Sequence, residues 1–382
     1  MVERRTPKLF NRKVMKKKKL RIATMVTGHF TTPPPFGVIY APMDIAVAVS
    51  EGLEARGHEV TFFGPEGTRV KVSRIEHGGL RPLKSDEGDS PILKGPNVGG
   101  AEAAKIFNLW DQYLIAAIYK EALEGKFDVV HIHPVDRALP FGYAVRNVPV
   151  VYTLHDPIYP WRAEIFKMFS SPNQHYVSIS DAQRVPAPNL NYAATIYNGE
   201  PVKEIPFSAN EGTYLLFVGR ITPEKGVAEA VEVARKTGEE LLVLGPPVTG
   251  DYWDKRIKPY LGGKIQHIGV VPRSDLYTYY KNAKATLVPI QWEEPFGLVM
   301  TESMATGTPV IAFRRGSVPE VVEDSKTGFI VDTVQEMAAA VKNIGKIDRK
   351  ACRARVEKHF SVEHMVDGYE KVFLKLAGGL PR

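Results

Sequence analysis

Two carboxylates eight residues apart, Glu294 and Glu302, bracket a Phe-Gly step that leads into an apolar, helix-like run. At ~100° per residue of helix, eight steps bring the second carboxylate near the face of the first. Gly297 would let the backbone enter this helix close to a ligand, with unpaired N–H groups that attract phosphate. Phosphate flanked by carboxylates that bind hydroxyl groups fits a sugar nucleotide. Two solvated glutamates on an amphipathic helix fit the same spacing, so the spacing alone leaves both interpretations open.

Two cations lie in the same half of the chain, directly after an expected strand at Tyr214–Val218. They are Arg220 and Lys225, in the segment Gly-Arg-Ile-Thr-Pro-Glu-Lys-Gly at residues 219–226. The guanidinium offers a planar fork of donors and the ammonium a mobile charge, so together they could neutralise a diphosphate leaving group. Because Arg and Lys are abundant on surfaces, the pair becomes informative only beside the two glutamates.

Histidines follow two strands expected in the first half of the chain. His131-Ile132-His133 ends one of them, and alternation along a strand points both imidazoles to nearly the same side. His-x-His could bind a metal, but no third or fourth ligand is evident nearby, so we predict no metal site. His155 follows the next strand and could line a cleft. A structural histidine is the alternative in each case.

A Thr- and Pro-rich loop at residues 31–37 precedes an expected helix at Ala41–Ala55. Its last residue, Gly37, could bring backbone N–H groups against a phosphate. The loop does not follow the G-x-G-x-x-G pattern, which weakens any interpretation as a nicotinamide-binding loop.

The composition is that of an ordinary globular protein. The chain has 382 residues, enough for two domains, with 44% hydrophobic and 24% charged residues. No run approaches the roughly 20 apolar residues that span a bilayer, and the first residues lack an apolar signal region. The single cysteine, Cys352, excludes an internal disulfide and fits a reducing compartment. We therefore expect a cytoplasmic protein.

The basic charge is concentrated at the start of the chain. The net charge is +7, and residues 1–20 hold nine Lys or Arg and one Glu, a net of +8, so the rest carries a net of −1. Four lysines at residues 16–19 could touch anionic lipid or nucleic acid. A solvated leader is the favoured interpretation. We predict no nucleic-acid partner and leave peripheral contact with the inner face of a membrane open. Met15 resembles a natural start, so residues 1–14 would be an upstream extension.

Strands and helices alternate in two successive series, which predicts βαβ units and parallel sheets. The first series contains strands at 20–26, 59–63, 128–132, 148–154 and 176–179, and helices at 41–55 and 101–123. The second contains strands at 214–218, 240–244, 264–267, 285–289, 308–312 and 328–331, with a helix at 227–237 and others between the later strands. Residues 80–100, rich in Gly and Pro, read as a mobile surface loop.

The break between the two series sets the predicted domains. We expect a basic tail at 1–19, a first Rossmann-like domain at 20–205 and a second at 206–360. A final helix within 361–382 would pack back on the first domain. Ligands of open parallel sheets bind beyond the carboxyl ends of the strands, so a cleft between the two domains is the expected site.

Taken together, the motifs resemble those of a retaining glycosyltransferase of family 4. The resemblance rests on Glu294 and Glu302, on residues 219–226 and on the turn Asn198-Gly199. Supporting motifs are Arg-Gly-His-Glu-Val at 56–60, His131-Ile132-His133, Ser-Ile-Ser at 178–180, Ala-Thr-Gly-Thr-Pro-Val at 305–310 and Gly-Ser-Val-Pro-Glu at 316–320. The matches run in order from about residue 20 to 375.

This resemblance implies a GT-B fold, in which two facing Rossmann-like domains enclose a cleft and the second domain holds a nucleotide-sugar donor. It assigns the ribose hydroxyls to Glu302 and the transferred sugar to Glu294. Backbone N–H groups near Phe296, Gly297 and Leu298 would meet the sugar and diphosphate. The other implied residues are Arg220 and Lys225 for the diphosphate in place of a metal, Val271 for a backbone contact to the base, His133 as the family's active-site histidine, and His155 on the acceptor side.

The resemblance also implies the chemistry. A hexosyl unit would pass to an acceptor hydroxyl by front-face substitution, with the departing phosphate helping to deprotonate the acceptor and the protein positioning charge. No cofactor is implied beyond the nucleotide sugar. Arg273 lies where guanine-using relatives can carry an acidic residue, which favours UDP over GDP. A GT-B-like UDP-sugar epimerase and a non-catalytic sugar-nucleotide binding module are the alternatives, and the acceptor is not identified.

Overall fold

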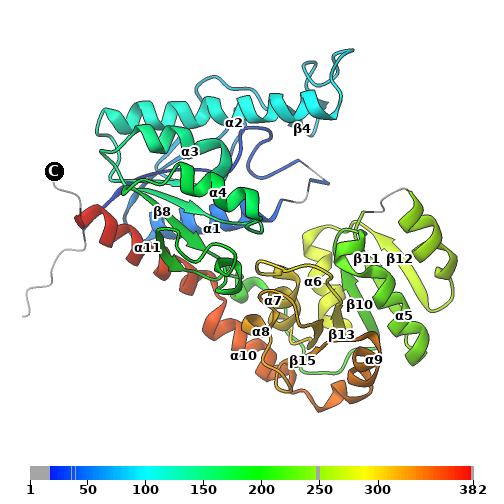
Figure 1. Ribbon diagram of the computed structural model, residues 1–382. Helices are drawn as coiled ribbons and strands as arrows, with labels where there is room; N and C mark the ends of the chain where they lie inside the picture. The colour runs from blue at the N-terminus through cyan, green and yellow to red at the C-terminus, as the bar shows by residue number, and fades with distance from the viewer. Residues whose placement is uncertain (1–17, 36, 39, 247–249, 380–382) are drawn as a thin grey trace, which may run out of the picture.

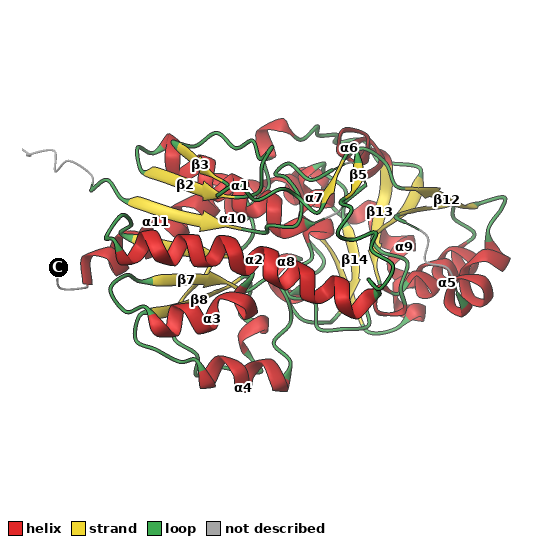
Figure 2. Cartoon of the chain, turned by 90° about the horizontal axis from the view of Figure 1, so that it is seen from above, coloured by secondary structure: helices red, strands yellow, loops and turns green. Residues whose placement is uncertain are grey.

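Two parallel α/β sheets, one in each lobe of the chain, form the framework of the molecule (Figures 1 and 2). The structure, a computed structural model, describes residues 18–379 except 36, 39 and 247–249. Most of the basic tail predicted at 1–19 therefore lies outside the described residues. The predicted α/β class and the two Rossmann-like sheets are confirmed.

The first sheet has seven strands in the order β3-β2-β1-β6-β7-β8-β9, and every neighbouring pair is parallel. Its strands are β1 (Arg21–Met25), β2 (Glu59–Phe63), β3 (Arg74–Glu76), β6 (Val129–Ile132), β7 (Val150–Thr153), β8 (Gln174–Ser178) and β9 (Tyr192–Thr195). Its helices are α1 (Ala41–Ala55), α2 (Gly100–Leu123), α3 (Val135–Ala144) and α4 (Pro160–Met168). Both faces of its central strands are buried, as is usual in parallel sheets.

Alternation along the strands divides the first lobe into two cores. Ala23 and Met25 of β1 pack with buried residues of α2, α3 and α4 on one face. Ile22, the residue before Ala23, points to the other face, where α1 and the last helix, α11 (Val362–Gly379), supply the partners. The two-residue period of a strand is the reason that one β1 segment serves both cores.

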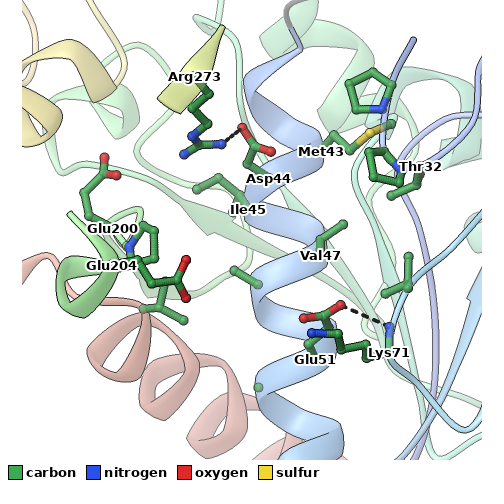
Figure 3. A pocket seen from close by; sticks show the side chains of 18 of the residues that line it. Thr32, Met43, Asp44, Ile45, Val47, Glu51, Lys71, Glu200, Glu204 and Arg273 are labelled. Atoms are coloured by element: carbon green, nitrogen blue, oxygen red, sulfur yellow. Dashed lines mark hydrogen bonds and ion pairs between the residues drawn. The ribbon is translucent and has the colours of Figure 1, made fainter. Parts of the chain in front are cut away.

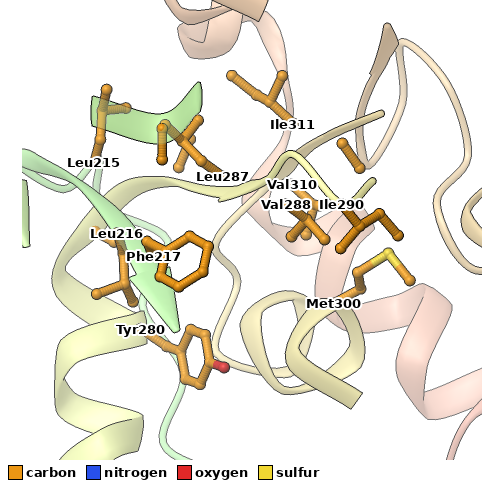
Figure 4. Close-up of a cluster of buried hydrophobic side chains, with 14 of the residues drawn as sticks. Leu215, Leu216, Phe217, Tyr280, Leu287, Val288, Ile290, Met300, Val310 and Ile311 are labelled. Carbon is orange, nitrogen blue, oxygen red and sulfur yellow. The ribbon is translucent and has the colours of Figure 1, made fainter. Parts of the chain in front are cut away.

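The second sheet has six parallel strands in the order β12-β11-β10-β13-β14-β15. From β10 the chain adds β11 and β12 on one side, and it then adds β13, β14 and β15 on the other side. The strands are β10 (Tyr214–Val218), β11 (Leu241–Leu244), β12 (Ile265–Gly269), β13 (Ala283–Val288), β14 (Val310–Phe313) and β15 (Gly328–Val331). The helices are α5 (Val227–Thr237), α6 (Arg273–Asn282), α7 (Leu298–Ala305), α8 (Val318–Val321), α9 (Val334–Asn343) and α10 (Arg349–His359). One continuous core fills this lobe; Figure 4 shows Leu216 and Phe217 among its residues.

Two segments cross between the lobes side by side. The backbone N–H of Glu200 donates to the carbonyl of Phe360 at 2.7 Å, and the N–H of Val362 donates to the carbonyl of Glu200 at 3.0 Å. Gly199 permits this approach, because a Cβ there would lie 2.7 Å from the carbonyl oxygen of Ser361. After the crossing, α11 lies against the first sheet and α1, where Arg56 Nη1 donates to Glu370 Oε2 at 2.9 Å.

Several predicted elements have the same bounds in the structure, including the helices at Ala41–Ala55 and Val227–Thr237. The region at 80–100 is not a plain loop, because it holds a short antiparallel hairpin, β4 (Lys84–Ser85) with β5 (Gly88–Asp89). Short 3-10 or π turns lie at Ala182–Arg184, Val202–Glu204, Pro223–Lys225, Trp253–Ile257, Lys258–Tyr260 and Ile344–Lys346. Over the part of the chain that the structure describes, no helix is long and apolar enough to cross a bilayer.

Candidate active site

The loop after β10 packs against the loop after β13, and glycine makes this possible. Gly226 has φ 75°, and a Cβ on it would lie 1.8 Å from the carbonyl oxygen of Pro289. The N–H of Gln291 donates to the carbonyl of Glu224 at 2.8 Å, which ties the two loops together. Lys225, between these contacts, is thereby carried to the residues that precede α7. The carboxyl ends of two adjacent parallel strands thus meet at one edge, where ligands of such sheets bind.

Lys225 and Glu294 form a partly buried ion pair at this edge. The Nζ atom lies 2.7 Å from Glu294 Oε2, and the two side chains are 21% and 12% exposed. Trp292 Nε1 donates to the same carboxylate oxygen at 3.1 Å, and its ring centroid lies 4.8 Å from the ammonium. One carboxylate is therefore held by a cation and an indole N–H while the cation lies over the aromatic face.

The segment that carries Glu294 is fixed by the turn before α8. Ser317 donates its backbone N–H to the carbonyl of Glu294 at 2.9 Å and its hydroxyl to the carbonyl of Phe296 at 2.8 Å. Gly316 is required next to it, because a Cβ there would lie 2.3 Å from the Glu294 carbonyl oxygen. The Gly-Ser-Val-Pro-Glu motif at 316–320 therefore supports the backbone of the candidate donor loop.

The predicted common helical face of Glu294 and Glu302 is wrong. Helix α7 begins at Leu298, with Gly297 in the left-handed region (φ 77°) at its N-terminal boundary, so Glu294 lies before the helix. Its position is set by loop packing, since helical periodicity does not extend to it. The Phe296 side chain is only 1% exposed and packs near Tyr197, so only its backbone can face a ligand.

Glu302 lies on α7 beside a second carboxyl that the sequence analysis missed. Tyr280 donates its hydroxyl to Glu302 Oε2 at 2.8 Å, and Thr301 donates its hydroxyl to Glu200 Oε1 at 2.7 Å. Burial raises the pKa of Glu200, and the Glu302 carboxylate raises it further. Burial also raises the pKa of Glu302, which the positive charge of Arg273 partly offsets. The only sequence signal for Glu200 was its place after the Asn198-Gly199 turn.

The other predicted donor residues of the second lobe lie on loops or at a helix start at the same edge. Arg220 is on the loop with Lys225, but its side chain is 61% exposed and its ion-pair partner is Glu224 at 3.9 Å. Val271 lies between β12 and α6, partly buried against the core. Leu298 opens α7 and packs partly against the cores of both lobes. The structure thus joins Lys225 to Glu294 directly and leaves Arg220 apart from that pair.

The first lobe contributes Gly37 and the histidines. Gly37 is exposed with φ 81°, and a Cβ there would meet nothing within 4 Å, so its backbone conformation rather than crowding favours glycine. His133 directly follows β6, and its Nδ1 lies 2.7 Å from Nε2 of His155. His131, on β6 itself, bonds through Nε2 to the Thr153 hydroxyl at 2.8 Å. His131 is thus committed to the interior, whereas His133 and His155 form a pair.

A cavity of about 1150 Å³ lies between the lobes and is walled by α1, the crossing segment at 199–204 and the start of α6 (Figure 3). Arg273 Nη1 reaches across it to Asp44 of α1, forming an ion pair between the lobes (Figure 3). Glu200 and Leu298 also line the cavity, whereas Lys225, Glu294 and His133 do not. The cavity therefore adjoins the Glu302 end of the site and not the Lys225 end.

Comparison with known proteins decides the family. A family model described as glycosyl transferases group 1 matches residues 200–358, and one described as glycosyltransferase family 4 matches residues 45–188. The two matches follow the two lobes. The chain is a family 4 glycosyltransferase. The family predicted from the motifs is confirmed, and with it an enzyme that uses a nucleotide-sugar donor.

Similar proteins support the same assignment along most of the chain. A phosphatidyl-myo-inositol mannosyltransferase of Mycolicibacterium smegmatis is 26% identical over 346 residues, 83% of this chain and 84% of that protein. An uncharacterized glycosyltransferase of Methanocaldococcus jannaschii, MJ1178, is 26% identical over 289 residues, 69% of this chain and 81% of that protein. Both proteins are similar to this glycosyltransferase, and neither similarity identifies its substrate.

Solved structures show the fold. Sucrose-phosphate synthase from Thermosynechococcus elongatus superposes with a TM-score of 0.73 at 19% identity, covering 94% of this chain and 100% of that one. Anabaena HepE in complex with UDP superposes with a TM-score of 0.69 at 16% identity, with the same coverage. The glycosyltransferase therefore has the GT-B fold predicted from its motifs. Among its described residues, no group of three or more His, Cys, Asp and Glu side chains is placed to hold a metal ion.

Proposed function

We propose that the protein is a retaining hexosyltransferase that moves a hexosyl unit from a UDP-sugar to an acceptor hydroxyl without a metal. The observation that carries the proposal is the Lys225–Glu294 pair at the entrance of α7, with Glu302 farther along the same helix. The order of these groups matches the parts of a nucleotide sugar. The cation would meet the diphosphate, the first carboxylate the hydroxyl groups of the hexose, and the second carboxylate those of the ribose.

Lys225 and Arg220 would bind the diphosphate. The mobile ammonium of Lys225 can turn from Glu294 to a phosphate oxygen, and the exposed guanidinium of Arg220 is free to fold over the same group. Charge develops on the diphosphate as the glycosidic bond breaks, so both cations would stabilise the transition state more than the bound donor. The backbone N–H groups at Gly297 and Leu298, where α7 begins, would add donors.

Glu294 would accept hydrogen bonds from the hexose, and Glu302 from the ribose. Tyr280 already holds one oxygen of Glu302, which leaves the other for a hydroxyl donor. Val271 would meet the base through its backbone. Arg273, beside this position, supports UDP over GDP, and HepE, whose structures hold UDP, UDP-glucose, or UDP with glucose, shares the fold.

The first lobe would carry the acceptor. We assign residues 20–205 to the acceptor domain and 206–360 to the donor domain. The segment that begins at residue 361 would pack back on the first domain. His133 and Gly37 would face the donor from the acceptor side, and the departing phosphate would take the acceptor proton as the new bond forms on the same face of the sugar.

A donor screen tests this proposal. The purified enzyme is incubated with UDP- and GDP-hexoses, with and without pools of sugar, lipid and polysaccharide acceptors, and released nucleotide is measured with and without EDTA. We expect acceptor-dependent release of UDP that persists in EDTA, and a product whose anomeric configuration by NMR equals that of the donor. Epimerised sugar without transfer would instead support the epimerase, and nucleotide binding with no turnover would support a binding module.

A further inference from the structure

We propose that His155 is a positioning residue that fixes the tautomer of His133, so that Nε2 of His133 carries the proton and serves as a hydrogen-bond donor to the bound sugar nucleotide. The inference rests on the proposed function for the identity of the ligand. It assigns His155 a role through His133 rather than the contact with acceptor predicted from the sequence.

The two histidines meet because two neighbouring parallel strands end together. β6 and β7 are paired through Ile132 and Tyr152, and the histidines come one and three residues later. His133 Nδ1 and His155 Nε2 are 2.7 Å apart, a hydrogen-bond distance, and the two ring planes are within 15° of parallel with centroids 5.0 Å apart. One proton must lie between these nitrogens, so the state of one ring determines the state of the other.

The orientation of His133 is already fixed by its surroundings. Its ring also contacts that of His131, whose centroid is 4.4 Å away. His131 is held by the Thr153 hydroxyl, which in turn bonds the Tyr369 hydroxyl of α11 at 2.8 Å. His133 is 5% exposed, and its Nε2 is buried with no hydrogen-bond partner among the described residues. An unpaired buried nitrogen just past a strand end is a group kept for a ligand.

The charges around the pair indicate which ring donates. Burial lowers the pKa of His155 to about 3, with a further contribution from Arg162, and lowers that of His133 well below its ordinary value, so both rings are neutral. Nε2 of His155 faces His133, and the positive charge of Arg162 acts on the His155 ring. We therefore place the lone pair of His155 on Nδ1 and its proton on Nε2. His155 Nε2–H then donates to His133 Nδ1, and the proton of His133 lies on Nε2, where it suits the oxygen acceptors of a sugar diphosphate.

Two substitutions of His155 distinguish a positioning role from a purely structural one. His155→Leu removes the donor, and we expect kcat to fall about 10- to 100-fold, by analogy with the loss of a partner that orients a metal-bound histidine, with the KM for the sugar nucleotide within about two-fold. His155→Gln restores an N–H donor and should recover most of kcat. In the His133→Ala background, His155→Leu should cause no further loss, because its effect passes through His133. Equal losses in Leu and Gln variants, or additive losses in the double variant, would overturn the proposal.

Nitrogen-15 NMR of the ligand-free enzyme tests the tautomer without turnover. We expect His133 to show an unprotonated Nδ1 and a protonated Nε2 in the wild type, and a mixture of tautomers in His155→Leu. The opposite tautomer in the wild type, or no change in the variant, contradicts the proposal. If the enzyme transfers no sugar at all, the proposed function fails while this measurement still decides the histidine pair; if His155→Leu does not fold, the wild-type spectrum and the Gln variant decide it.

Discussion

Lys225 Nζ lies 2.7 Å from Glu294 Oε2, so the cation proposed for the diphosphate and the carboxylate proposed for the hexose neutralise each other in the free enzyme. The pair avoids leaving either charge alone in a partly buried position, where an unpaired charge is costly. A donor that offers an anion to Lys225 and hydroxyl groups to Glu294 replaces both halves of the pair at once. Fragments that offer only one of these should therefore bind more weakly than the whole donor.

Replacement of Lys225 tests the first half of this exchange. Lys225→Ala removes the charge that would meet the diphosphate, and we expect kcat/KM to fall by about 10²- to 10³-fold, the range for losing one transition-state donor. Steady-state kinetics with the best donor measures the loss. Lys236→Ala, at an exposed lysine of α5 that pairs with Glu232, is the matched control and should leave kcat/KM unchanged. A loss of less than a few-fold in Lys225→Ala would refute the assignment.

Glu302 is expected to determine affinity for the nucleoside. Glu302→Gln removes the charge from the carboxyl that would hold the ribose, and we expect the Kd of UDP to rise about ten-fold, since a hydrogen bond to a charged group contributes about 1.5–3 kcal/mol. Tyr280→Phe, which removes only the hydroxyl that supports Glu302, should weaken binding less. Isothermal titration calorimetry compares them, and an unchanged Kd in Glu302→Gln would show that the ribose lies elsewhere.

The buried carboxyl of Glu200 should make stability depend on pH. Its pKa in the folded state is raised by burial and by Glu302, so it stabilises the fold while protonated. The contribution of Glu200 to the free energy of unfolding is fully present at pH values below its unfolded-state pKa. It is lost as the pH rises through its folded-state pKa. Glu200→Gln keeps an acceptor for Thr301 and removes the charge. Its melting temperature should equal that of the wild type near pH 4 and exceed it by roughly 2 °C or more at pH 8–9.

Differential scanning fluorimetry across this pH range tests the expectation. Glu204→Gln, at an exposed glutamate of the same crossing segment, is the control and should follow the wild type at every pH. A Glu200→Gln variant that loses stability at alkaline pH would contradict the sign of the predicted dependence.

The two glycines that flank α5 allow the cost of backbone strain to be distinguished from the cost of steric crowding. Gly226 and Gly238 flank α5 with nearly equal φ, 75° and 72°, but a Cβ on Gly226 would collide with the Pro289 carbonyl whereas one on Gly238 meets nothing within 4 Å. Gly238→Ala should cost about 1–2 kcal/mol, the price of the left-handed conformation alone. Gly226→Ala should cost more and displace Lys225, lowering activity as well. Equal stability losses in chemical denaturation would show that the two loops can separate freely.

The sequence gives much of the fold because periodicity is local. Apolar residues at helical spacing located helices such as Val227–Thr237, and short β-type runs located strands such as Glu59–Phe63, with their observed bounds. It missed β3 and β9, whose short, partly exposed strands carry little pattern, and the α3 helix, which contains Pro140. It also read the hairpin at Lys84–Asp89 as plain loop, since two-residue strands have no periodicity.

The sequence by itself determined the family of this protein and the order of its candidate donor residues, because both are carried by short motifs in which neighbours along the chain act together. The tertiary structure alone decided how these residues pair. Lys225 and Glu294 are 69 residues apart, Glu200 and Thr301 are 101 apart, and His133 and His155 are 22 apart. The Lys225–Glu294 and His133–His155 pairs form where neighbouring strands of one sheet end, and the Glu200–Thr301 pair forms where the crossing segment meets α7. The burial that changes their charge and hydrogen bonding exists only after these distant segments have packed together.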